Sequence, residues 1–470
     1  MKKILLLNPP GKYPYLRDQY CSSAAKAGYY WPAVDLLVLS GILSPHFELK
    51  VLDAIVEKSN LGDVLDILQK DKYSAVISLA SSASKDEDFE LFKQIKFQLN
   101  IPVIANGGFL RLNPQGYLQN FKFLEAVITD YTQAGIVDFL NGQTVDLEGI
   151  CIRGGQEVKG SYDPQKYFSY PVPRHDLFPL EKYFTPQSKG RKFSSVLTSY
   201  GCSYNCRFCA SAKIEYKLRD IPNLIQELKS LTKLGVKEIH FPDFTFTANR
   251  LHCFKVCETI IRERLNISWD CLTRSDCFDE QLLRSMKKAG CHTIQAGVET
   301  KNENVLKNMG KYISNSTVRQ AFALCRKHEI ETIGFFIIGL PGEDKKSIKQ
   351  TIKFAKELNC DYASFSVFVP DFGSDIRQEL VAANPQVEWI YDFDRTKFPV
   401  ISNGFLSPKQ IWSLRNKAIR DFYFRWSYVW KRLRGITNFK ALINAFKIFW
   451  SLFYDQINVC GSRYFKGGQS

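Results

Sequence analysis

The clearest chemistry in this sequence belongs to three cysteines, Cys202, Cys206 and Cys209, which are separated by three and by two residues. Phe208 precedes the last of them, and residues 193–201 predict a strand that runs into a loop starting at a glycine. Three thiolates on one short loop can hold three irons of a 4Fe–4S cluster. The fourth iron would then have no protein ligand and could bind a substrate or cofactor directly. The spacing therefore indicates a catalytic cluster rather than an electron-transfer cluster.

Other roles for these cysteines stay open at this point. Structural zinc usually takes four protein ligands, and the next thiols, Cys253 and Cys257, stand more than forty residues further on in a helical pattern. Zinc would therefore need a split site. A disulfide framework is disfavoured because no signal peptide opens the sequence and disulfides are rare in reducing compartments. Polar residues between the three cysteines disfavour three unrelated buried thiols. We expect the other ten cysteines, which are scattered, to be reduced packing residues.

The cysteine motif also resembles a known family. Cys-x3-Cys-x2-Cys with an aromatic residue before the last cysteine, on the loop after a first barrel strand, resembles the radical SAM superfamily. The resemblance implies that the amino and carboxylate groups of S-adenosylmethionine chelate the open iron. One electron from the cluster then cleaves the sulfonium and releases a 5′-deoxyadenosyl radical. By this resemblance Cys202, Cys206 and Cys209 are the catalytic metal ligands.

Alternating strand and helix patterns surround the motif and must position it. From Ser194 to about Pro370 we count six strand patterns separated by helical ones, including the strand before the cysteines. This alternation predicts a partial (β/α)6 barrel of TIM type within residues 191–395. The active sites of such barrels gather at the carboxyl ends of the strands. The other five strand patterns lie at residues 236–241, 267–272, 292–297, 332–339 and 362–368.

Polar residues at these strand ends are the candidates for binding S-adenosylmethionine. A carboxylate can accept hydrogen bonds from both ribose hydroxyls, and an arginine can pair with a carboxylate in a charge-assisted way. The resemblance assigns Glu299, in the segment that starts at Gly297, to the ribose. It assigns Arg274 to the methionine carboxylate and Asp243 to the orientation of the methionyl amine.

The same resemblance places the adenine between the backbone near Phe208 and the apolar pair Ile337 and Ile338. Several strand-end residues have a simpler alternative role. Asp243 and Thr245 could cap the helix that follows the second strand, and we favour helix capping for the residues at 343–344.

The first 150 residues show a second set of alternating strands and helices. This pattern predicts a parallel, doubly wound, Rossmann-like sheet. Ligands of such sheets bind beyond the carboxyl ends of the strands. Small and polar residues stand at these ends: Asn8, Pro9, Asp53, Ser81, Ser82, Gly107 and Gly108.

This N-terminal region resembles the cobalamin-binding domain that precedes the barrel in one branch of the superfamily. The opening Leu7-Asn-Pro-Pro10, the pair Gly107-Gly108 and the stretch Tyr29-Tyr-Trp-Pro32 carry the resemblance. It implies that the strand-end residues named above bind cobalamin. The motif Asp-x-His-x-x-Gly is missing, and no histidine occurs between Phe47 and Arg174, so we expect no histidine lower ligand. A degenerate domain that binds no ligand is the alternative.

The remaining segments are a connector at residues 151–190, which we expect to be structural, and a basic C-terminal region at residues 396–470. Residues 401–470 contain twelve Lys and Arg against two Asp, a net charge of +10 out of +15 for the whole chain. Two stretches there, 421–434 and 439–454, mix aromatic with basic residues and predict helices. Neither is apolar and long enough to span a bilayer. Three interpretations compete: packing on the barrel, packing combined with contact to a membrane surface, and binding of single-stranded nucleic acid. Binding of single-stranded nucleic acid is disfavoured. Radical SAM enzymes that modify RNA usually carry a small β-barrel RNA-binding domain, whereas this tail predicts helices.

Together these features predict an α/β protein with a cobalamin-binding Rossmann-like domain, a radical SAM barrel and a helical tail. By resemblance it is a cytoplasmic enzyme that uses a 4Fe–4S cluster, S-adenosylmethionine and cobalamin to methylate an unactivated carbon of a hydrophobic small molecule or lipid. Cyclisation or rearrangement by the same architecture is one alternative, and a non-catalytic redox sensor is another. We expect an electron donor such as flavodoxin or ferredoxin, and peripheral contact of the tail with the inner face of the membrane.

Overall fold

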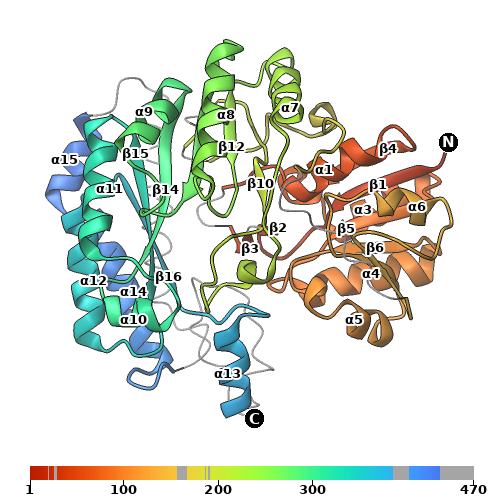
Figure 1. Ribbon diagram of the computed structural model, residues 1–470. Coiled ribbons are helices and arrows are strands. Elements are labelled where there is room, and N and C mark those ends of the chain that lie inside the picture. Colours follow the sequence, from red (N-terminus) through yellow and green to blue (C-terminus); the bar gives the residue numbers. More distant parts are fainter. Residues whose placement is uncertain are drawn as a thin grey trace.

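Two parallel sheets, one in each half of the chain, organise the protein (Figure 1). The computed structural model describes residues 1–19, 21–25, 29–155, 167–185, 187–188, 191–384 and 402–434. The predicted α/β class, with a doubly wound first half, a partial barrel and a helical C-terminal region, is confirmed.

The first sheet has the strand order β4-β1-β5-β6-β7-β8. The five strands expected from the sequence are parallel, and β8, which the sequence did not indicate, pairs antiparallel with β7 at the edge. Leu5 and Leu7 of β1 face one hydrophobic cluster while Ile4 and Leu6 face another, so helices cover both sides. The strands are β1 (Lys3–Asn8), β4 (Glu48–Asp53), β5 (Ala75–Leu79), β6 (Val103–Asn106), β7 (Leu124–Ile128) and β8 (Ile150–Ile152). The helices are α1 (Val34–Leu43), α2 (Ala54–Glu57), α3 (Leu61–Lys70), α4 (Lys85–Leu99), α5 (Pro114–Asn120) and α6 (Gly135–Leu140).

A hairpin follows the first strand and folds back over the sheet. It consists of β2 (Tyr15–Asp18) and β3 (Cys21–Ala24), which pair antiparallel. In Figure 1 the hairpin lies at the centre of the molecule, between the two sheets. The hairpin therefore lies where a ligand of either sheet would be expected to bind.

The second sheet runs in chain order, β9-β12-β13-β14-β15-β16, and all neighbouring strands are parallel. Phe336 and Phe365 point outward and are buried under helices, whereas Ile337 and Ser366 alternate with them and are partly exposed on the concave side. The strands are β9 (Phe193–Ser195), β12 (Glu238–Phe241), β13 (Ser268–Thr273), β14 (Cys291–Glu299), β15 (Glu331–Ile338) and β16 (Tyr362–Val367). The helices are α7 (Ile221–Lys233), α8 (Arg250–Arg262), α9 (Glu280–Lys288), α10 (Glu303–Asn308), α11 (Asn315–Lys327), α12 (Lys345–Leu358) and α13 (Asp375–Ala383).

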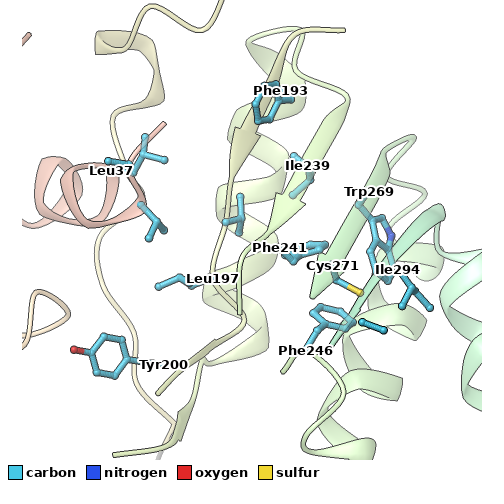
Figure 2. Packing of buried hydrophobic residues seen from close by; sticks show 14 of the residues in the cluster. Leu37, Phe193, Leu197, Tyr200, Ile239, Phe241, Phe246, Trp269, Cys271 and Ile294 are labelled. Carbon is cyan, nitrogen blue, oxygen red and sulfur yellow. The ribbon is translucent and has the colours of Figure 1, made fainter. Parts of the chain in front are cut away.

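One hydrophobic cluster joins the two halves. All ten residues of α1 are buried, which is typical of a helix enclosed on every side. Figure 2 shows side chains of this cluster extending from Leu37 on α1, past Leu197, to Trp269 on β13 of the barrel. The described part of the connector is attached to the barrel, since His175 hydrogen-bonds both Ser194 of β9 and Glu227 of α7 at 2.9 Å.

The described part of the C-terminal region covers the open edge of the barrel sheet. It forms α14 (Pro408–Tyr423) and α15 (Trp426–Arg434). The Tyr423 hydroxyl donates to the Ala363 carbonyl at 2.7 Å and accepts from the Ala363 amide at 3.1 Å, so it satisfies the backbone of β16 as a further strand would. The predicted helix over 439–454 lies outside the described residues. Among the described helices, none is both long and apolar enough to cross a bilayer.

Candidate functional site

The three cysteines lie on the loop between two short strands, β10 (Ser199–Tyr200) and β11 (Lys217–Leu218). All three are free thiols and half-buried. The loop begins at Gly201, whose φ of +76° and whose approach to the Glu215 carbonyl leave no room for a side chain. It turns back where the Cys209 amide donates to the Cys206 carbonyl at 3.0 Å.

The electrostatics of the loop suit an anionic cluster. Burial raises the pKa of the Cys206 thiol, and the nearby cations Lys311 and Arg274 oppose that shift. Burial also raises the pKa of Cys209, against the opposing hydrogen bonds from Ser211, and the charges of Cys202 and Cys206 add to the rise. In a cluster the three sulfur atoms would bind iron as thiolates, so their negative charge would no longer be buried without a positive partner. The donor set therefore fits the predicted 4Fe–4S cluster.

The split zinc site finds no support in the described residues. Cys253 and Cys257 are fully buried on α8, next to Cys271 and Cys291 in the hydrophobic core and away from the loop. Within the described ranges, no group of three or more His, Cys, Asp or Glu side chains is arranged to hold a single metal ion.

Arg274, at the end of β13, lies over the cysteine loop. Its guanidinium forms a two-pronged ion pair with Asp276 at 2.9 and 2.7 Å, and a third nitrogen lies 3.8 Å from the Cys206 sulfur. The guanidinium carbon stands 4.1 Å from the centre of the Tyr204 ring. Asp276 thus orients Arg274 while Tyr204, from the loop itself, packs against it. The predicted pairing of Arg274 with a ligand carboxylate remains a prediction.

Glu299, at the end of β14, is held by a lysine that the sequence did not single out. The buried ammonium of Lys311 donates to the Glu299 carboxylate and to the Gly297 carbonyl, both at 2.7 Å. Glu299 itself has a φ of +62°, next to an irregularity in the pairing with β15. A non-glycine residue in this conformation stores strain, which is typical of functional sites. The ribose role of Glu299 and the place of Gly297 beside the ligand stay predictions.

Asp243 has a different role from the predicted one. Its carboxylate is fully buried and accepts hydrogen bonds from the amides and hydroxyls of Thr198 and Ser199. It therefore holds the strand that leads into the cysteine loop and lies behind that loop, so we correct the predicted contact with the methionyl amine. The capping alternative is also wrong, since Asn249 caps α8.

The adenine prediction needs a similar correction. Ile338 is fully buried in the outer core, because side chains alternate along β15 and Ile338 points toward the helices. Its neighbour Ile337 packs instead with Phe208 against a small apolar cluster at the strand ends. That cluster consists of Val305, Met309, Leu340, Phe368 and Ile376. The apolar wall beside the cysteine loop is thus formed by Phe208 and Ile337.

The residues at the start of α12 divide between two roles. Asp344 caps the helix, as predicted, by accepting from the Ser347 amide at 2.7 Å. Glu343 is buried and accepts from the Gly339 and Leu340 amides and from Thr300, so it braces the turn rather than capping the helix.

In the first sheet the predicted ligand edge is closed. Strand order reverses between β1 and β5, and the crevice of a doubly wound sheet opens there. Arg17, from the hairpin, fills this crevice: its side chain is fully buried and pairs with the equally buried Asp88 at 2.9 Å. It also donates to the Asn8 side chain at 3.2 Å and to the Pro9 carbonyl at 2.7 Å.

The neighbouring residues are tied into the same network. Asp53 accepts from Asn8 at 2.9 Å and from Tyr183 at 3.0 Å, and the Ser81 amide donates to Asp88 at 3.1 Å. The cavity left among the side chains around Arg17 has a volume of about 10 Å³, room for one water molecule. Asn8, Pro9, Asp53 and Ser81 are thus buried in this network, and their role in cobalamin binding stays a prediction.

The other end of this edge is open. Gly107 packs against the Ala80 carbonyl, whereas a side chain added at Gly108 would meet no atom within 4 Å. Ser82 is half-buried. Of the predicted set, Ser82 and Gly108 are the two that are partly exposed.

Comparisons with a family model, with related sequences and with solved structures bear on this geometry. Residues 196–355 match the family model for the radical SAM superfamily. An uncharacterized methyltransferase of Pyrococcus horikoshii is 29% identical over 438 residues, which are 90% of this chain and 93% of the relative. An anaerobic magnesium-protoporphyrin IX monomethyl ester cyclase of Rubrivivax gelatinosus is 30% identical over 233 residues, and this chain covers 41% of its length.

A solved structure shares the fold over most of both chains. The radical S-adenosylmethionine methyltransferase TsrM from Kitasatospora setae, solved with cobalamin and a [4Fe-4S] cluster bound, superposes with a TM-score of 0.63. It is 18% identical, and the match covers 81% of this chain and 76% of TsrM. The likeness shows a common architecture of an N-terminal α/β half and a barrel.

Proposed function

We propose a function on the premise that this chain belongs to the radical SAM superfamily, to which residues 196–355 match. It is a radical SAM enzyme, and we infer that it transfers a methyl group to a carbon of its substrate with the help of cobalamin. The name of the Pyrococcus relative and the fold shared with TsrM support the methyl transfer.

The observation that carries this proposal is the set of charges around the cysteine loop. Three half-buried thiols lie on one loop beside the cations Arg274 and Lys311, with the strained Glu299 at the adjacent strand end. A ligand with a carboxylate and a ribose would meet Arg274 and Glu299 here. Asp276 and Lys311 keep those two side chains in place before the ligand arrives, so little ordering is needed on binding.

The bound cofactors would supply radical formation and the methyl group, and the protein would supply position and exclusion of water. Cys202, Cys206 and Cys209 would hold the cluster. Ser82 and Gly108 would border the cobalamin, because the other predicted residues of that edge are closed. We keep a hydrophobic small molecule or lipid as the substrate class, and the exposed aromatic side chain of Trp426 in the C-terminal region supports it.

Two further parts of the proposal concern partners. The cluster needs an electron donor, for which a flavodoxin or ferredoxin is suited. The second part is contact of the C-terminal region with a membrane surface inside the cell. Trp426 of α15, which is 88% exposed, supports this contact because tryptophan favours the interface of a bilayer.

The first experiment separates an enzyme from a non-catalytic sensor. The reconstituted chain is incubated anaerobically with S-adenosylmethionine and a reductant, with Cys206→Ala as the control. We expect 5′-deoxyadenosine from the native protein and only background from the variant. Equal background from both would argue for the sensor and against the proposal.

A second measurement separates methyl transfer from ring formation, which the likeness to the Rubrivivax cyclase keeps as the second candidate. With cobalamin bound and cell extract as the source of substrate, methyl transfer produces S-adenosylhomocysteine as well as 5′-deoxyadenosine. Production of 5′-deoxyadenosine alone would favour cyclisation or rearrangement.

A further inference from the structure

The loop with the three cysteines is bracketed by a two-stranded ribbon. Tyr200 of β10 pairs with Lys217 of β11, and Ser199 pairs with Leu218. Asp243 fixes this ribbon on the barrel side, through the hydrogen bonds to Ser199 described above. The ribbon is also fixed from the other side, by the N-terminal half.

Lys217 makes the attachment to the N-terminal half. Its side chain is 9% exposed, and its ammonium donates to the Asp130 carboxylate at 2.6 Å and to the Thr132 hydroxyl at 2.5 Å. Both partners lie just after β7, at the carboxyl end of the first sheet. The ammonium also stands 4.8 Å from the centre of the Tyr200 ring and 5.2 Å from that of Phe168. The Lys217 ammonium is largely removed from water, so these ionic, hydroxyl and aromatic partners together hold it in place.

Tyr200 adds a second attachment at the same place. Arg111 donates to the Tyr200 hydroxyl at 3.3 Å, and the Tyr131 ring meets the Tyr200 ring edge-on at 5.4 Å between centres. Figure 2 shows Tyr200 turned toward the N-terminal half. Only Gly201 separates Tyr200 from Cys202, so a movement of this ribbon moves the cysteines.

We propose that Lys217 is a positioning residue for the iron–sulfur cluster, which ties the cysteine-bearing ribbon to the carboxyl edge of the N-terminal sheet. This inference rests on the proposed function, since it needs a cluster on the three cysteines. Residues that hydrogen-bond a metal ligand directly typically alter metal affinity 10- to 100-fold when they are removed. Lys217 acts one step further out, through the strand that carries Tyr200, so we expect the lower end of this range. The N-terminal sheet would thus help to set the geometry of the cluster as well as bordering the cobalamin.

The chain offers a matched control close by. Lys213 lies four residues before Lys217 and pairs with Asp375 at 2.6 Å, but both side chains are more than 40% exposed, at 47% and 41%. That pair connects the loop to α13 of the barrel and not to the first sheet. Exposed pairs of this kind contribute little.

The experiment uses the full-length chain, reconstituted with iron and sulfide under anaerobic conditions. Lys217→Met keeps most of the side-chain volume and removes the charge. We expect it to lose iron to a chelator roughly tenfold faster than the native protein. We also expect a changed electron paramagnetic resonance spectrum of the reduced cluster. Lys217→Arg should recover part of the loss, and Lys213→Met should match the native protein in both measurements.

Asp130→Asn provides an independent route if Lys217→Met does not fold, because it weakens the same ion pair from its partly exposed side. Iron loss and spectra equal to those of Lys213→Met, in each of the two variants that folds, would overturn the positioning role while the proposed function stands. A native chain that holds no 4Fe–4S cluster after reconstitution would instead overturn the proposed function, and this inference with it.

Discussion

The carboxyl edges of the two sheets differ in the structure, although the sequence predicts a ligand site at each of them. At the barrel edge the three thiols stay half-buried, and the charges of Arg274 and Glu299, which are themselves buried in ion pairs with Asp276 and Lys311, act on Cys206. At the edge of the first sheet Arg17 occupies the crevice and binds Asn8, the Pro9 carbonyl and Asp88. Both edges collect polar residues, but the edge of the first sheet uses most of them to bind its own chain.

The difference lies in the segment that follows the first strand. In the barrel, the loop after β9 carries the cysteines and is held from behind by Asp243. In the first half, the segment after β1 returns as a hairpin and buries a guanidinium over the strand ends. Topology thus fixes where polar residues gather, and the connecting segment decides whether a ligand can reach them.

The largest expected effect tests the closed edge. Arg17→Met would leave Asp88 buried without its partner, and breaking a fully buried ion pair in this way costs about 3–5 kcal/mol. We expect a correspondingly lower urea midpoint of unfolding. Asp88→Asn, which removes the charge from the other side, should destabilise less when combined with Arg17→Met than the sum of the two single changes. A midpoint within error of the native value would contradict the closed network.

The matching change at the barrel edge should affect ligand binding as well as stability, because Arg274 is itself paired with Asp276. Arg274→Met would remove the predicted charge-assisted contact to the ligand carboxylate, worth about 1.5–3 kcal/mol, so the dissociation constant for S-adenosylmethionine should rise about 10- to 150-fold. Titration calorimetry on reconstituted protein measures it. Lys229→Met, which removes an exposed pair with Glu263 near the C-terminal ends of α7 and α8, is the control. Equal affinity in both variants would remove Arg274 from the site.

A pair of adjacent glycines tests the boundary between the closed and open parts of the first edge. In Gly107→Ala the new methyl group would lie 2.3 Å from the Ala80 carbonyl oxygen, an overpacking that costs about 1–3 kcal/mol. Gly108→Ala meets open space and should leave stability unchanged. If cobalamin borders Gly108, the second variant should retain less of it in absorbance measurements. Normal cobalamin content in Gly108→Ala together with a loss in Gly107→Ala would reverse this assignment.

The smallest effect concerns pH at the closed edge. Burial raises the pKa of Asp53 from 3.8 to about 6, against the opposing hydrogen bonds from Val56, Tyr183 and Asn8. The native state therefore keeps a proton that the unfolded chain releases. The resulting stabilisation is complete below pH 3.8 and is lost as pH rises through about 6. Asp53→Asn should flatten the stability profile over this window, as measured by thermal unfolding at several pH values, and an unchanged slope would contradict it.

These contrasts also explain what the sequence could predict. Alternating apolar segments were enough to predict the succession of strands in the barrel. The local spacing of the three cysteines was enough to predict a cluster site. Asp276 could have been found, since it stands two residues after Arg274. By contrast Arg17, Lys217 and Lys311 resemble ordinary surface cations in sequence, and their burial depends on partners that lie 71, 87 and 12 residues away. The sequence could not separate Ile337 from Ile338, because a continuous apolar run does not reveal which residues face inward.

The hydrophobic cluster that runs from α1 into the barrel makes the two halves one folding unit. A fragment that begins near residue 191 would leave Val196, Leu197 and Tyr200 without much of their apolar cover, because that cover includes α1 and the first sheet. Such a fragment would be prone to aggregation, and chain cleavage in the connector would not release two independent domains. Any enzyme engineered by exchanging the N-terminal half would need to inherit α1 and its barrel contacts as one block.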